Sequence, residues 1–197
     1  MMTGSARSAF VSRAGEKLAA GLDAFGLSVT GATCADFGCN VGGFTDCLLA
    51  RGAARVYAVD TGYGALAWKL RTCERVVVME RTNALHCDVP EPVDLVAIDV
   101  AWTPQERIVP AAMRWLRPGG AILSLLKPHY ERAKRPGRGD RSPLGDADAR
   151  RLCLDVCLRL GASGFRTQAV AASPIRGKGG NVEFLLLLSG ETDAGES

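Results

Sequence analysis

The chain has 197 residues, 47% of them hydrophobic, which is enough for one well-packed domain and too short for two of ordinary size. Its formal net charge is only +3. No apolar run approaches the roughly 20 residues needed to cross a bilayer, and the N-terminus MMTGSARSAF lacks the apolar core of a secretion signal. These features argue against a membrane protein and predict a single cytoplasmic domain.

The first segment predicts a leading helix. Within residues 10–27, Leu18, Leu22 and Phe25 fall on one helical face, and Ser12 is a plausible N-cap. The expected organisation is an N-terminal segment with this helix (1–30), a main domain (31–190) and a tail (191–197).

From residue 33 onward, apolar runs alternate with amphipathic segments. Strands are predicted at 33–37, 55–60, 75–80, 93–100 and 121–127, and helices at 44–51, 65–71, 104–116 and 146–164. Pro104 suits a first helical turn, RPGG at 117–120 supplies a helix stop, and Asp146 is a potential cap. The alternation predicts an α/β fold with a doubly wound, mostly parallel sheet.

The last part of the chain lacks a crossover helix. Residues 164–173 and 181–189 are strand-like, and only the turn PIRGKGG separates them. Parallel neighbours need a long connection, so these two strands are expected to form an antiparallel hairpin. A parallel sheet that ends in a reversed strand is typical of Rossmann-like class I methyltransferases, whereas dinucleotide-binding folds end parallel.

The cysteines and histidines do not indicate a metal site. The seven cysteines form no C-x-x-C pair and fall mostly in apolar runs, which favours reduced core thiols over disulfides or zinc ligands. His86 adjoins Cys87, but with two histidines in the chain no ligand set can be assembled there. No metal is expected.

The turn DFGCNVGGFTD, residues 36–46, follows the first predicted strand. Gly38, Gly42 and Gly43 allow a ligand to approach the backbone closely, and Asp60 ends the second strand, where its carboxylate can accept both hydroxyls of a ribose. The turn lacks the G-x-G-x-x-G spacing of pyrophosphate sites. A nucleoside ligand without phosphates, such as S-adenosylmethionine, therefore suits it better than NAD.

Several long motifs agree, in order and spacing, with one family. VSRAGEKL, DFGCNVGGFTD, VYAVDTGYGALAWKLR, VVMERTNA, VDLVAIDV, LRPGGAILSLLKP and SPIRGKGGNVEFLLLL resemble the catalytic part of the TlyA (hemolysin A) family of FtsJ-like RNA 2'-O-methyltransferases. The likeness runs from about Val11 to Leu188. It implies S-adenosylmethionine as cofactor and RNA, in particular ribosomal RNA, as substrate.

The resemblance also implies which residues form the site. The family's Lys-Asp-Lys-Glu tetrad matches Lys17, Asp99, Lys127 and Glu183. The implied cofactor contacts are Asp36, Gly38, Asn40, Gly42, Gly43, Phe44, Asp60, Asn83 and Asp99.

Three of the four tetrad residues are also brought together by the predicted topology. Asp99 and Lys127 end parallel strands, and Glu183 begins a reversed strand, so all three lie at the same edge. Each has a structural alternative: Asp99 as a helix cap, Lys127 as a solvated strand end, and Glu183 as a partner of Arg176 or Lys178. Lys17 rests on the resemblance alone.

Methyl transfer from a sulfonium to a hydroxyl requires oxygen, methyl and sulfur to be held in line, and the hydroxyl must lose its proton. Lys127 is the candidate to orient the oxygen and take the proton. Whether it is a true base or only an orienting group is left open by the sequence.

The chain departs from the family in two ways that concern RNA. Only about ten residues precede VSRAGEKL, where family members usually carry a small RNA-binding domain, so RNA would be gripped by the catalytic domain, by a helper protein, or by the basic segment 131–141. After the catalytic Asp, this chain has DVAWTPQ in place of Ser-Phe. Trp102 is either a stacking partner for an unpaired base or a packing residue.

Two other functions stay open at this point. A methyltransferase of the same fold could act on a small molecule or a protein, and RNA binding with a clear salt dependence would argue against it. A non-catalytic RNA-binding or scaffold protein could keep the fold, but the intact tetrad argues against that.

Overall fold

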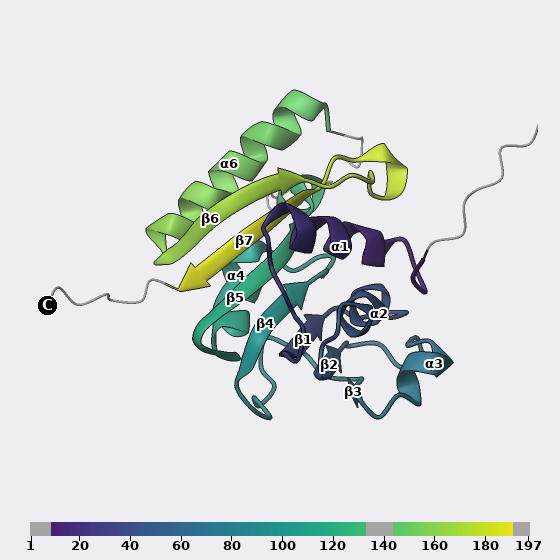
Figure 1. Cartoon of the computed structure of the whole chain (residues 1–197). Coiled ribbons are helices and arrows are strands. Elements are labelled where there is room, and N and C mark those ends of the chain that lie inside the picture. The colour runs from purple at the N-terminus through teal and green to yellow at the C-terminus, as the bar shows by residue number, and fades with distance from the viewer. Residues whose placement is uncertain (1–8, 133–143, 191–197) are drawn as a thin grey trace, which may run out of the picture.

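A computed structural model describes residues 9–132 and 144–190 as helices packed on both faces of a seven-stranded sheet (Figure 1). The strands are β1 (Thr33–Phe37), β2 (Arg55–Val59), β3 (Val76–Met79), β4 (Val93–Ile98), β5 (Leu116–Leu126), β6 (Phe165–Ala172) and β7 (Phe184–Gly190). The helices are α1 (Ala14–Ala24), α2 (Gly43–Ala50), α3 (Trp68–Arg71), α4 (Gln105–Met113), α5 (Pro128–Glu131) and α6 (Asp146–Ala162), with a short 3-10 turn, η2 (Lys178–Gly180).

The strand order is β3-β2-β1-β4-β5-β7-β6. Strands β1 to β5 pair in parallel, and β7 lies antiparallel between β5 and β6. The expected α/β architecture, a mostly parallel doubly wound sheet that ends in an antiparallel hairpin, is therefore confirmed. Because β7 runs against its neighbour β5, the start of β7 lies at the edge where the parallel strands end.

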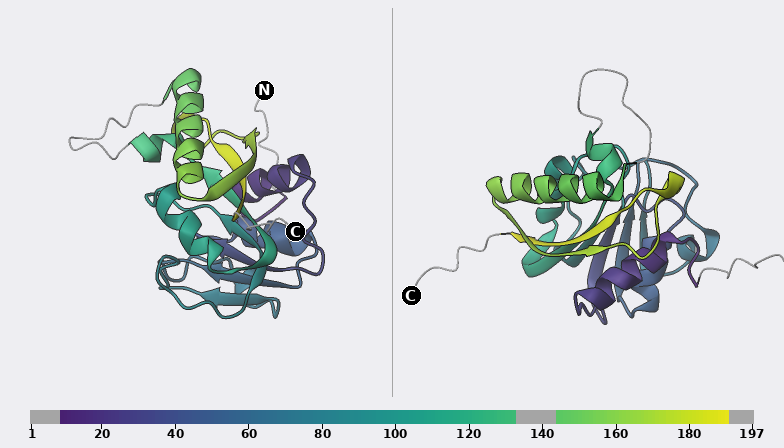
Figure 2. Two further views of the ribbon diagram at one scale, coloured as in Figure 1. Left: turned by 90° about the vertical axis from the view of Figure 1, so that its left-hand side faces the viewer. Right: turned by 90° about the horizontal axis from the view of Figure 1, so that it is seen from above.

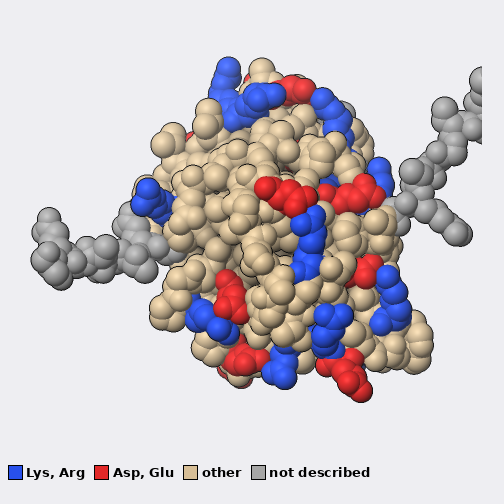
Figure 3. Space-filling model, in the orientation of Figure 1, with Lys and Arg blue, Asp and Glu red and all other residues tan. Residues whose placement is uncertain are grey.

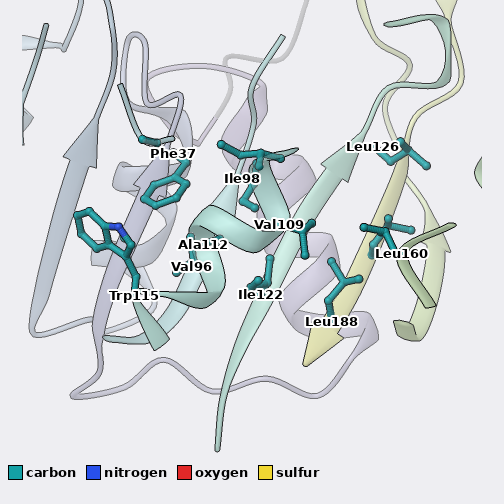
Figure 4. Packing of buried hydrophobic residues seen from close by; sticks show 14 of the residues in the cluster. Phe37, Val96, Ile98, Val109, Ala112, Trp115, Ile122, Leu126, Leu160 and Leu188 are labelled. Carbon is teal, nitrogen blue, oxygen red and sulfur yellow. The ribbon is translucent and has the colours of Figure 1, made fainter. Parts of the chain in front are cut away.

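Two hydrophobic layers enclose the sheet. Helices α4 and α6 pack on one face and α1 and α2 on the other (Figure 2). On the α4 and α6 side, the fully buried ring of Trp115 meets Phe37 and Tyr57 edge-on, with ring centroids 5.2 and 5.9 Å apart. Figure 4 shows this layer, to which β1, β4, β5, β7, α4 and α6 all contribute. This core fixes the strand ends that carry the candidate site.

Among the described residues, the face that carries α1 and the β6–β7 hairpin shows no large patch of like charge. Lys, Arg, Asp and Glu side chains are interspersed there (Figure 3), in keeping with the small net charge of +3. Of the helices within residues 9–132 and 144–190, none has the length and apolar character needed to cross a membrane.

The boundary between α4 and β5 differs from expectation. The residues RPGG (117–120) were expected to stop a helix that extended to 116, but α4 already ends at Met113 and β5 begins at Leu116. The pairing of β5 with β4 shifts register between Val93 and Leu95. Strand β4 already pairs with β5 at Leu116, ahead of the two glycines. The glycines therefore form an irregularity inside a long strand. Helix α3 is also shorter than expected, at four residues.

The two expected N-caps do not act as caps. Helix α1 begins after Arg13, and Ser12 lies one residue earlier. Helix α6 begins after Gly145, and the carboxylate of Asp146 forms an ion pair with Arg176 at 2.9 Å instead. Asp146 is the first residue inside α6 and therefore does not occupy the position from which a side chain caps the helix.

Helix α1 is held in place by a close contact with α2. A Cβ atom at Gly15 would lie 2.7 Å from the carbonyl oxygen of Gly43, so a side chain there cannot be accommodated without movement. The Val11 N–H also donates to Asp46 Oδ2 at 2.8 Å. Gly43 was expected only as part of the ligand-binding turn. Gly43 also packs against α1, the helix that carries Lys17.

Gly15→Ala should push α1 away from α2 and lower the free energy of unfolding by about 1–3 kcal/mol, because the contact between the two helices leaves no room for a methyl group. Gly161→Ala in α6 is the matched control, since a Cβ atom there meets nothing within 4 Å. It should be neutral or stabilising by up to about 1 kcal/mol. Urea unfolding of both variants measures the difference. Equal effects would contradict a tight contact at Gly15.

Candidate active site

A pocket of about 310 Å³ opens where the parallel strands end. It lies among the residues that follow β1, β2, β3 and β4. A smaller hollow of about 170 Å³ adjoins it next to the start of α1 and the end of β5. The two share Gly38, Asn40, Asp99 and Ala101. Together they form one candidate site with the size of a small-ligand pocket.

The glycine turn borders both hollows because its backbone adopts left-handed conformations. Gly38 has φ 85°, and a Cβ atom there would lie 2.7 Å from the carbonyl oxygen of Asp99. Gly42 has φ 97° and forms the N-cap of α2. Asn40 also has a positive φ, 46°, which is uncommon for a residue other than glycine. Gly38 therefore permits a close approach between the turn and the backbone of Asp99, and the approach of a ligand to the turn stays a prediction.

Asp60 directly follows β2 and faces the larger pocket. Its Oδ2 accepts the N–H of Asn40 at 2.8 Å, and its Oδ1 accepts the N–H of Gly62 at 2.7 Å. Each carboxylate oxygen has a second lone pair, so both can still accept a hydroxyl from a ligand. Asp60 therefore organises the glycine turn and remains available to a ribose.

Asp36 is placed differently from a simple ligand contact. It is completely buried, and its Oδ2 accepts the N–H and the hydroxyl of Thr45 at 2.8 and 2.7 Å. Burial raises the pKa of Asp36 to about 7, against the opposing effect of the Thr45 hydrogen bond. Its buried Oδ1 has no hydrogen-bond partner among the described residues, and Asp36 is one of the residues around the smaller hollow. Thr45 was not predicted, because a hydroxyl on a buried helix carries no signal in the sequence.

The pH dependence of stability tests the raised pKa of Asp36. The pKa in the folded protein lies above the ordinary value of 3.8, so the stability contributed by the neutral carboxyl is complete below about pH 4 and is lost as the pH rises through about 7. Asp36→Asn stays neutral and should show a smaller fall in the free energy of unfolding between about pH 5 and pH 8. Urea unfolding across this range measures it. Parallel curves for the two proteins would contradict the raised pKa.

Of the remaining predicted cofactor residues, Gly43, Phe44 and Asn83 border the hollows, whereas Gly42 borders neither. Gly43 and Phe44 begin α2 and border the smaller hollow, where Phe44 is only 2% exposed. Asn83 borders the larger pocket, and its Oδ1 accepts the N–H of Leu85 at 3.0 Å. Phe44 therefore offers an apolar wall, whereas Asn83 has its amide nitrogen left to donate to a ligand.

The four tetrad positions form two ion pairs. Lys127 Nζ lies 2.5 Å from Asp99 Oδ1, and Lys17 Nζ lies 2.5 Å from Glu183 Oε2. The Lys127 side chain is 15% exposed, so it is not a solvated strand end, and the N-cap of α4 is Pro104 rather than Asp99. Glu183 is bound by Lys17 and not by Arg176, which pairs with Asp146.

The antiparallel register between β5 and β7 brings the two ion pairs together. Leu126 of β5 pairs with Phe184 of β7, so Lys127 and Glu183 occupy opposite positions just beyond the last pair. The turn before β7 packs directly on this carboxylate, since a Cβ atom at Gly177 would lie 2.6 Å from Cδ of Glu183. Gly177 is a site residue that the sequence did not reveal, because its glycine-rich turn is equally suited to an ordinary hairpin.

Trp102 lies on the rim of the larger pocket and is 75% exposed. Its ring centroid lies 4.6 Å from that of Tyr130, and the Lys127 ammonium lies 6.0 Å from the Tyr130 ring. Trp102 is therefore not a packing residue. Tyr130 is a second aromatic neighbour that the sequence did not single out.

The basic segment 131–141 falls mostly outside the described residues. Of its residues, Glu131 is not part of a loop: it ends α5, is buried, and accepts the N–H of Gln105 at 2.9 Å. Residues 133–141 lie beyond what the structure describes, so the expected role of this segment in gripping RNA stays a prediction.

The reversed terminal strand, the pocket at the carboxyl edge and the acid after β2 define a Rossmann-like class I methyltransferase. Residues 10–189 match the family of FtsJ-like methyltransferases. The chain belongs to this family and is a methyltransferase, which confirms the resemblance drawn from its motifs.

Curated relatives extend the match. The chain is 42% identical over 193 residues to the 16S/23S rRNA (cytidine-2'-O)-methyltransferase TlyA of Mycobacterium tuberculosis, covering 94% of this chain and 70% of the relative. It is 41% identical to the putative rRNA methyltransferase YqxC of Bacillus subtilis, covering 91% of this chain and 65% of the relative. Both relatives are longer than the region they share with this chain.

Solved structures agree with the fold. A putative hemolysin from Streptococcus thermophilus has a TM-score of 0.85 at 34% identity, covering 97% of this chain and 70% of that one. The N-methyltransferase NodS from Bradyrhizobium japonicum, solved with S-adenosyl-L-homocysteine, has a TM-score of 0.62 at 14% identity, covering 91% and 86%. The second likeness concerns the fold alone.

Proposed function

We propose that this protein is an S-adenosylmethionine-dependent methyltransferase that modifies a ribose 2'-hydroxyl of RNA, in particular of ribosomal RNA. The observation that carries the proposal is the position of the Lys127–Asp99 ion pair. Asp99 borders both hollows, and Lys127 borders the smaller one. Relatives whose names state ribosomal RNA cytidine 2'-O-methylation support the substrate class.

The residues of the two hollows suit the proposed cofactor. Asp60 can accept the two ribose hydroxyls of an adenosyl group, because each of its oxygens keeps a free lone pair. Asp36 is one of the residues around the smaller hollow, and its Oδ1, which has no hydrogen-bond partner among the described residues, could accept from the ammonium of an amino-acid end. When bound, S-adenosylmethionine would supply a methyl group activated by a positively charged sulfur.

Lys127 is placed to act on the acceptor hydroxyl. The Lys127 ammonium donates to the carbonyl oxygen of Val100 at 3.2 Å, and Asp99 Oδ1 lies 2.5 Å away as its ion-pair partner. A further ammonium hydrogen can donate to the ribose oxygen and hold it in line for transfer. A charged lysine can take the hydroxyl proton only by passing one of its own to Asp99. The proton therefore ends on the Lys127–Asp99 pair as the new carbon–oxygen bond forms.

The second ion pair would position the first. Glu183 occupies the position opposite Lys127 in the register between β5 and β7, and Lys17 neutralises its charge. Tyr130 lies beside Lys127 and contacts Trp102, and the two rings offer an aromatic surface to an unpaired base, which is a common way to recognise RNA outside helices. An accessible ribose held beside a stacked base is the substrate this arrangement suits best.

The test is incubation of the purified protein with S-adenosylmethionine carrying a radiolabelled methyl group and total bacterial RNA. The RNA is then digested to nucleosides and separated. Label in a 2'-O-methylnucleoside is expected, and it would also identify the modified nucleoside. Label in a base-methylated nucleoside, or binding of the cofactor without labelling of RNA, would contradict the proposal.

A further inference from the structure

Aromatic and basic side chains follow the strands along the carboxyl edge of the sheet. In spatial order, Arg81 comes after β3, Tyr63 after β2, Trp102 after β4 and Tyr130 after β5, and the glycine turn after β1 lies in the middle. Trp102 and Tyr130 belong to the substrate surface proposed above. Tyr63 and Arg81 lie on the other side of the glycine turn and have no role in the chemistry.

Hydrogen bonds hold together the two segments that carry Tyr63 and Arg81. The Gly62 N–H donates to Asp60 Oδ1 at 2.7 Å, and the Gly64 N–H donates to Glu80 Oε1 at 2.9 Å. The Arg81 N–H donates to the Gly62 carbonyl oxygen at 2.9 Å. Tyr63 is therefore anchored on both sides, although its side chain is 70% exposed. An exposed ring on a fixed turn is presented to solvent and not packed.

Arg81 is held over this ring by an unusual backbone. Its φ is 53°, and among the described residues Asn40 of the glycine turn is the other non-glycine residue with a positive φ. Such conformations are uncommon in non-glycine residues and concentrate at functional sites. The guanidinium carbon of Arg81 lies 4.2 Å from the centroid of the Tyr63 ring. A cation over an aromatic face keeps its N–H donors free at the edges.

The charge of Arg81 is not neutralised by its neighbour. Glu80 pairs with Arg71 at 2.5 Å and accepts the Gly64 N–H, and these contacts lower the pKa of Glu80 to about 2. Within residues 9–132 and 144–190, no carboxylate forms an ion pair with Arg81. Arg81 is thus an exposed, oriented and unpaired cation one residue away from Thr82, which borders the larger pocket.

We propose that Arg81, held by Tyr63, binds a backbone phosphate of the RNA substrate on the side of the pocket opposite Trp102. The proposal rests on the function proposed above. A planar guanidinium is well matched to a phosphate, and a strand whose base stacks on Trp102 would continue across the pocket mouth toward Arg81. Trp102 would hold the target nucleotide through its base, and Arg81 would hold it through its backbone phosphate.

The test compares Arg81→Gln with wild type for binding of a fluorescein-labelled RNA stem–loop at several salt concentrations. Loss of one phosphate contact should weaken binding about threefold to tenfold near 100 mM salt and reduce the slope of log affinity against log salt by about 0.7–0.9. In methyl transfer, KM for RNA should rise while kcat stays within about twofold. The affinity for S-adenosyl-L-homocysteine should be unchanged.

Arg166→Gln is the matched control, because Arg166 is exposed on β6 at the opposite end of the strand order. It should bind RNA like wild type. Tyr63→Leu should weaken RNA binding in part, and Tyr63→Phe should restore it by keeping the ring.

Two results would overturn the role of Arg81: an unchanged salt slope in Arg81→Gln, or an equal loss of cofactor affinity. Failure of the proposed function would give a different result, because wild type itself would then not methylate RNA ribose.

Discussion

Lys127→Ala should reduce methyl transfer by about 10³-fold while leaving the affinity for S-adenosylmethionine within a few-fold of wild type. The substitution removes the ammonium that can hold the ribose oxygen and relay its proton to Asp99, and general acid–base groups contribute on the order of 10²–10⁴-fold. Cofactor affinity should persist, because Asp60 and the glycine turn are untouched. Calorimetry with the cofactor and single-turnover transfer to RNA measure the two quantities separately.

Lys69→Ala is the matched control for Lys127→Ala. Lys69 also pairs with an aspartate, Asp46, at 2.9 Å, but its side chain is 59% exposed and borders neither hollow. It should retain full transfer, since an exposed ion pair contributes little. If Lys127→Ala kept appreciable turnover, its assignment as the group that acts on the hydroxyl would be wrong.

Asp60→Asn should weaken cofactor binding by about 10–100-fold. The carboxylate accepts two backbone N–H groups and would accept two ribose hydroxyls, and hydrogen bonds to a charged group contribute about 1.5–3 kcal/mol. An asparagine offers one acceptor oxygen and presents an amide N–H₂ where the second oxygen stood. Calorimetric titration with S-adenosyl-L-homocysteine measures the loss. The effect should be larger for Asp60→Ala, which also frees the Asn40 and Gly62 amides.

Asp94→Asn tests whether such a loss is specific. Asp94 accepts the Thr33 N–H at 2.8 Å and pairs with Arg117, but it lies at the amino end of the strands. Its replacement should affect stability and leave cofactor affinity intact. A comparable drop in affinity in both variants would indicate a general disturbance of the sheet instead of a lost ligand contact at Asp60.

The mostly parallel sheet and the terminal hairpin were predictable because they follow from local patterns. Short apolar runs that alternate with helical segments require a parallel sheet, and two strands joined by a short turn cannot be parallel neighbours. Helix boundaries were less predictable. RPGG carries a strong local stop signal, yet β5 begins ahead of it because β4 is available for pairing from Val93. Tertiary pairing overrides a turn signal when the neighbouring strand supplies hydrogen bonds.

The candidate site was partly predictable for the same reason. Asp60, Asp99 and Lys127 each come directly after a strand, so the topology alone places them at one edge. Lys17 could not be placed in this way, because its position depends on the contact between Gly15 and Gly43. Thr45, Gly177 and Tyr130 carry no signal in the sequence.

By itself, the sequence determined the fold, the edge of the sheet where the candidate site lies and the residue types gathered there, because these depend on periodicity and chain order. Only the tertiary structure decided which charges pair. Lys17 and Glu183 are 166 residues apart and meet through the packing of α1 and the pairing of β7 with β5. The buried state of Asp36 and the stacking of Arg81 on Tyr63 were decided in the same way. Such contacts arise from the packing of distant segments, which no local pattern encodes.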